Sequence, residues 1–167
     1  RSVLVVVTRR IGDVLLATPV LRSLKKGWPD AAIDVLVFEG TEGVVTANPD
    51  VRTVLTVPQR PGPLQHARLH SRLLRRYDVA LSLVPSDRPT LYAFGAGRRR
   101  IGLLSNTGKD AWKRRLLDQW VPFDNLDTHT VRMHLALVDA LGVTPIPEVV
   151  VRSEEHTSEL PSQFRIS

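Results

Sequence analysis

Two arginines, a glycine and a carboxylate stand together in the stretch TRRIGD, residues 8–13. The apolar run SVLVVV precedes it, and apolar residues at helical spacing follow it, which predicts a strand, a turn and a helix. Gly12 is expected to let the backbone turn sharply beside a ligand. Asp13, near the helix start, is expected to stay ionised and to accept a proton from a substrate hydroxyl. Asp is also a favoured helix N-cap, so capping is the competing interpretation.

The positive charges of this stretch suggest an anionic ligand. Cations at a helix N-terminus oppose the helix dipole, so Arg9 and Arg10 make better sense if an anion lies between them and the helix. The whole chain carries a net charge of +6, and residues 60–115 hold thirteen Lys and Arg against three Asp. Such a block indicates phosphate, an acidic sugar, nucleic acid or a membrane surface as partner, although a solvated surface explains any single arginine equally well.

Apolar runs and helical patterns alternate along the chain. The expected strands cover residues 2–8, 32–38, 52–57, 78–84 and 99–103, and the expected helices cover 13–27, 41–47, 64–76, 88–96 and 128–142. Strands that are apolar on both faces and separated by helices predict an α/β fold, a Rossmann-like doubly wound parallel sheet. Residues 104–127 show no clear period and are expected to form a long, partly ordered loop. Pro19 lies inside the first helical segment, so either that helix is kinked or residues 13–17 form a separate first turn.

Several other chemistries lack their sequence signals. No G-x-G-x-x-G follows the first strand, which argues against a dinucleotide-binding domain of an oxidoreductase. The chain has no cysteine, so disulfides and thiolate metal sites are excluded. His66 and His70 form an i,i+4 pair without the intervening glutamate of a metalloprotease, and a solvated helix face is the simpler interpretation. No metal site is predicted.

Three blocks of the sequence, in the order in which the family has them, resemble glycosyltransferase family 9, the ADP-heptose:lipopolysaccharide heptosyltransferases. They are IGDVLLATPVLRSLKKGWPDAAIDVLV at 11–37, YDVALSLVPSDRPTLYAFGAGRRRIGL at 77–103, and HTVRMHLALVDALGV at 129–143. Pro19 belongs to the family pattern. Within the second block, VPSDRP resembles the branch labelled heptosyltransferase III.

The resemblance implies a GT-B enzyme with two Rossmann-like domains, of which the N-terminal domain binds the acceptor. It implies metal-independent, inverting transfer of heptose from ADP-heptose to the anionic lipopolysaccharide inner core, with no cofactor and with Asp13 as general base. Arg9 or Arg10 is then expected to bind a phosphate or carboxylate of the acceptor, or to meet charge near the leaving pyrophosphate, and both are assigned to acceptor binding. By loop position we add four further acceptor-binding cations, Arg60, Arg88, Lys113 and Arg114.

The domain prediction assigns residues 1–151 to the acceptor-binding domain of a truncated GT-B enzyme. Residues 152–167, which include RSEEHTSEL, look like a translated sequencing-library adapter and are expected to be a non-native tail. The ADP-sugar would bind through the missing C-terminal domain, so the isolated chain is not expected to turn over substrate.

The expected location is the cytoplasm of a Gram-negative bacterium, at or near the inner face of the inner membrane. The alternatives are an oxidoreductase nucleotide-binding domain and a basic module that binds anions or nucleic acid, although no specific nucleic acid is expected.

Overall fold

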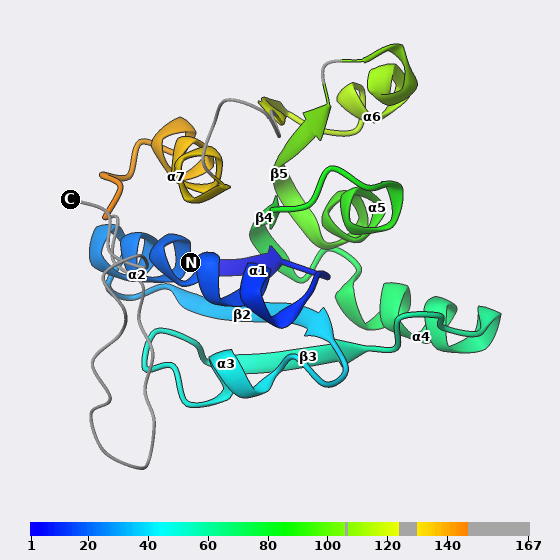
Figure 1. Ribbon diagram of the computed structural model, residues 1–167, viewed down its shortest axis with the longest axis horizontal. Helices are drawn as coiled ribbons and strands as arrows, with labels where there is room; N and C mark the ends of the chain where they lie inside the picture. The colour runs from blue at the N-terminus through cyan, green and yellow to red at the C-terminus, as the bar shows by residue number, and fades with distance from the viewer. Residues whose placement is uncertain (106, 124–129, 147–167) are drawn as a thin grey trace.

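A six-stranded parallel sheet forms the centre of the computed structural model, which describes residues 1–105, 107–123 and 130–146 (Figure 1). The strand order is β3-β2-β1-β4-β5-β6, and every neighbouring pair is parallel. The predicted doubly wound α/β fold is therefore confirmed. The strands are β1 Ser2–Val6, β2 Ala32–Phe38, β3 Thr53–Val57, β4 Tyr77–Ser82, β5 Gly97–Ser105 and β6 Gln119–Phe123.

Helices cover both faces of this sheet. One apolar core lies between the sheet and α1, α2, α3 and α7, and a second lies between the opposite face and α4 and α5. Val3 and Leu4 are adjacent in β1 and point into different cores, and both are fully buried, because successive strand side chains face opposite sides. The helices are α1 Ile11–Leu16, α2 Thr18–Gly27, α3 Gly43–Thr46, α4 Pro63–Leu73, α5 Asp87–Ala96, α6 Ala111–Arg114 and α7 Thr130–Ala140, with the 3-10 helix η1 at Gly108–Asp110.

The first helical segment is two helices rather than one. α1 ends at Leu16, and α2 begins at Thr18 with Pro19 in its first turn, where a missing backbone N–H costs nothing. The hydroxyl of Thr18 donates to the carbonyl of Leu15 across the junction at 2.8 Å. Pro19 thus begins a helix, which removes the conflict that a continuous helix would have produced.

The region predicted as a loop contains a strand that the sequence analysis missed. β6 pairs with β5 from Ile101↔Gln119 to Ser105↔Phe123 and forms one edge of the sheet. Its residue Pro122 is tolerated because an edge strand needs hydrogen bonds on one side only. The prediction of a loop over 104–127 is wrong for β6, η1 and α6, and the predicted tail at 152–167 lies outside the described residues.

Candidate functional site

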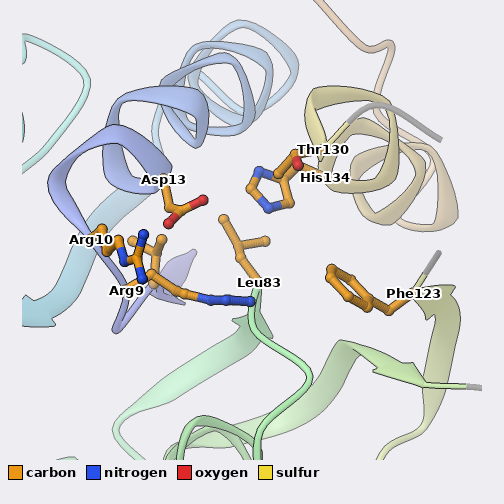
Figure 2. Close-up of a pocket in the computed structure, with 8 residues that line it drawn as sticks. Arg9, Arg10, Asp13, Leu83, Phe123, Thr130 and His134 are labelled. Carbon is orange, nitrogen blue, oxygen red and sulfur yellow. The ribbon is translucent and has the colours of Figure 1, made fainter. Parts of the chain in front are cut away.

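A pocket of about 350 Å³ opens where the strand order changes direction. β1 and β4 are neighbours in the middle of the sheet, and the chain leaves them toward opposite edges, so the loops at their carboxyl ends diverge. This is the place where open α/β sheets bind ligands. The pocket is lined by Val7, Arg9, Arg10, Asp13, Leu83, Phe123, Thr130 and His134 (Figure 2).

Asp13 lies in the first turn of α1 and lines this pocket. The N-cap of α1 is Arg10, and no side chain makes a capping hydrogen bond there. The capping interpretation of Asp13 is therefore wrong. Gly12 has no left-handed backbone, and a Cβ built on it meets nothing within 4 Å. The expected sharp turn therefore does not require glycine, and what Gly12 provides is open space beside Asp13.

His134, from α7, lies on the other side of the pocket and faces the Asp13 carboxylate (Figure 2). Its side chain is buried, and its Nδ1 has no hydrogen-bond partner in the described part of the chain. Burial lowers the pKa of His134 to about 4, although the Leu16 and Leu83 backbone and the Asp13 carboxylate act in the opposite direction. The ring is therefore neutral at neutral pH and forms no ion pair with the Asp13 carboxylate.

The two arginines of the first loop reach the same pocket from different directions. Arg9 is partly buried and extends across the floor of the pocket toward Leu83 and Phe123, whereas Arg10 stays on the Asp13 side (Figure 2). The pocket therefore joins two guanidinium groups and one carboxylate. A ligand with an anionic substituent and a hydroxyl group matches this arrangement.

The other four predicted cations do not line this pocket. Arg60 is exposed in the loop after β3, and Arg88 donates to the carbonyl of Gln59 at 2.8 Å, which ties α5 to that loop. Arg114 stacks on Trp120 with its guanidinium 4.6 Å from the ring centre. These residues lie after β3, β4 and β5, at the edge of the sheet where the pocket also opens.

Lys113 has a different environment from the one expected of an acceptor-binding cation. Its side chain is only 2% exposed, and its Nζ lies 2.6 Å from Asp110, 2.8 Å from Asp87 and 2.8 Å from the carbonyl of Pro85. The ammonium group has three hydrogens and three internal acceptors. Lys113 therefore joins α5 to α6 and has no hydrogen left for an external anion.

The sequence analysis missed His134, Thr130 and Phe123 as pocket residues. His134 lies three residues after Val131 and four before Val138, on the apolar face of α7, and a polar side chain on such a face was the available signal. Phe123 ends β6, a strand that was not predicted.

Within the described ranges, no three His, Cys, Asp or Glu side chains gather as metal ligands. None of the described helices is long and apolar enough to cross a bilayer.

Sequence comparison finds relatives over most of the chain. Lipopolysaccharide heptosyltransferase 3 of Escherichia coli K12 is 26% identical over 141 residues, covering 80% of this chain and 40% of the relative. Lipopolysaccharide heptosyltransferase 2 of Salmonella typhimurium LT2 is 31% identical over 127 residues, covering 66% of this chain and 36% of the relative. The chain is similar to the heptosyltransferases. The resemblance predicted from the three sequence blocks is confirmed, while no family model matches the chain.

Solved structures of the same group share the fold. A family 9 glycosyltransferase from Veillonella parvula superposes with a TM-score of 0.76 at 20% identity, covering 91% of this chain and 44% of that one. The E. coli heptosyltransferase WaaC with ADP gives 0.72 at 20% identity, covering 87% of this chain and 49% of that one. The chain thus spans about 40% of the length of the heptosyltransferases it resembles in sequence, and about half the length of the solved ones.

Proposed function

We propose that this chain is the acceptor-binding, N-terminal domain of a GT-B heptosyltransferase that extends the lipopolysaccharide inner core. The observation that carries the proposal is the position of Asp13, Arg9 and Arg10 in one pocket at the switch point of the sheet. The similarity to heptosyltransferases supports the same assignment. The donor would be ADP-heptose, bound by a second domain, and the reaction would need neither metal nor cofactor.

In the proposed reaction, the Asp13 carboxylate accepts the proton of an acceptor hydroxyl. That oxygen attacks the anomeric carbon of the heptose from the face opposite the ADP, so a new C–O bond forms as the bond to the ADP phosphate breaks. The configuration at the anomeric carbon is thereby inverted, and ADP leaves with the electron pair. Because His134 is neutral at neutral pH, it forms no ion pair with Asp13, and the carboxylate oxygens stay available to the acceptor hydroxyl.

Arg9 and Arg10 would bind a carboxylate or phosphate of the acceptor. Guanidinium groups make short, charge-assisted hydrogen bonds to such anions, and these bonds fix orientation as well as affinity. With its anion held by Arg9, which extends away from Asp13 toward Leu83, the acceptor would present a hydroxyl to the Asp13 carboxylate (Figure 2). Arg60, Arg88 and Arg114 would add a positive field along the same edge of the sheet.

This edge would also face the inner surface of the cytoplasmic membrane, where the acceptor lipid is held. Ile11, Leu64 and Trp112 are exposed large apolar residues. They follow β1, β3 and β5, so they lie at the same carboxyl edge as the exposed arginines. Apolar side chains beside cations are typical of proteins that bind the surface of an anionic bilayer.

The test is heptosyl transfer by the complete gene product that contains this chain. We expect ADP-heptose and a heptose-deficient lipopolysaccharide core to give ADP and a core one heptose heavier, detected by mass spectrometry. A matched pair of variants, Asp13→Asn in the pocket and Asp30→Asn in the exposed α2–β2 turn, should lose and keep this activity respectively. Absence of transfer together with saturable NADH binding would favour the oxidoreductase alternative, which the similarity to heptosyltransferases does not support.

A further inference from the structure

Two histidines and a tyrosine form a polar cluster on α4 and α5, outside the pocket described above. His66 and His70 are one helical turn apart, and their Nε2 atoms lie 3.1 Å from each other. The Nδ1 of His66 lies 3.2 Å from the hydroxyl oxygen of Tyr92, which is fully buried on α5. Both imidazoles are only partly exposed, so the simple interpretation of a solvated helix face is wrong.

We propose that His66 and His70 form a binding site for one divalent transition-metal ion of the zinc class. A zinc–imidazole bond is about 2.0–2.1 Å long, so two ligand nitrogens in a tetrahedral site lie about 3.3 Å apart. The observed separation of 3.1 Å is within a few tenths of an ångström of that value. A small rotation of either ring would therefore let both Nε2 atoms contact one ion.

Tyr92 supplies the outer contact that such a site requires. A histidine that binds metal through one ring nitrogen normally donates its other N–H to a fixed acceptor, which sets the tautomer and the ring orientation. With the metal on Nε2, the proton of His66 must be on Nδ1, and the Tyr92 hydroxyl oxygen lies where it can accept that hydrogen bond. Because Tyr92 is fully buried, this partner is fixed in position before any metal arrives.

Both imidazoles are partly exposed, so we expect water to reach the remaining coordination positions. In the described part of the chain no third His, Cys, Asp or Glu joins the pair, so water would complete the coordination sphere. Imidazole ligands favour zinc, copper and nickel over magnesium and calcium. Arg88, one helical turn before Tyr92 on α5, carries a positive charge that opposes the binding of a cation.

The test is a calorimetric titration of this chain with ZnCl₂ at neutral pH. We expect one saturable equivalent of Zn²⁺, no response to MgCl₂, and loss of the transition in both His66→Gln and His70→Gln. Tyr92→Phe should weaken Zn²⁺ binding by about tenfold or more, the usual effect of removing an outer partner of a ligating histidine. His156→Gln, which changes a histidine outside the described residues, is the matched control and should bind as the unaltered chain does.

Circular dichroism and thermal unfolding establish that each variant is folded before its titration is compared. In parallel, nitrogen-15 NMR of the imidazoles should show Zn²⁺ shifting the Nε2 signals of His66 and His70. The proposal is overturned if the unaltered chain shows no saturable binding, or if His66→Gln and His70→Gln bind Zn²⁺ with unchanged affinity. Neither result depends on heptosyl transfer, so this test is independent of the proposed function.

Discussion

Acidification should destabilise this chain through His134, and replacing that residue with asparagine should remove part of the pH dependence. The unfolded chain protonates this imidazole near pH 6.5, whereas the folded chain does so only near pH 4. Between these values the unfolded state binds more protons, so the free energy of unfolding falls as the pH falls. Above about pH 7 the ring is neutral in both states and contributes no pH dependence.

The size of this effect follows from the two pKa values. A shift from 6.5 to about 4 destabilises the folded state by about 2 kcal/mol at pH 5, relative to pH 7. The side chain is 3% exposed, so solvent screening removes little of this difference. Asparagine has no titrating group, and its packing cost is present at both pH values, so that cost cancels when the two are compared.

Urea unfolding followed by tryptophan fluorescence at pH 7 and pH 5 is the appropriate assay. The loss of stability between these pH values should be about 2 kcal/mol smaller in His134→Asn than in the unaltered chain. Carboxylates that titrate in this range are common to both proteins and drop out of the comparison. If both proteins lose the same stability on acidification, His134 is not a buried neutral group and its place in the pocket is wrong.

Three further outcomes follow from the same structure. Arg9→Gln should weaken binding of an anionic inner-core oligosaccharide by about tenfold or more, since a hydrogen bond to a charged group contributes about 1.5–3 kcal/mol; unchanged calorimetric affinity would remove Arg9 from the acceptor site. Lys113→Met should lower the free energy of unfolding by about 3 kcal/mol, because it leaves the buried Asp110 carboxylate without its partner. The exposed Lys109→Met is the control for Lys113, and an equal loss in urea unfolding of both variants would refute the argument. Trp112→Ala, at an exposed site, should reduce co-sedimentation with anionic vesicles and leave oligosaccharide affinity unchanged; undiminished vesicle binding would exclude this edge as the membrane contact.

Four of the five strands that the sequence predicted, β1, β2, β4 and β5, lie inside the sheet, and the fifth, β3, is an edge strand marked by its unbroken run TVLTV. Val3, Leu4, Val5 and Val6 all lie in a core, so a continuous apolar run marks β1 without any alternation. β6 could not be found in this way, because its half-exposed run QWVPF is interrupted by Pro122. Its presence depends on pairing with β5, a tertiary contact that no local pattern encodes.

The candidate site was predictable only where its residues are close together in the chain. Arg9, Arg10 and Asp13 belong to one loop and one helical turn, so their proximity followed from the sequence. His134 comes to Asp13 only because α7 packs against α2 and lies over the same end of the sheet. For Lys113, the residue type indicated an exposed cation, but its partner Asp87 is distant in sequence and could not be inferred.

The measurement that tests the central claim most directly is the turnover number of Asp13→Asn in the complete gene product, with acceptor binding measured alongside. The account predicts a fall of about 10²–10⁴-fold in kcat, the usual contribution of a general base. It also predicts that the acceptor dissociation constant stays within a few-fold, because the arginines that bind the anion are intact. A kcat that is unchanged would contradict the assignment of Asp13 as the base and, with it, the proposed chemistry of this pocket.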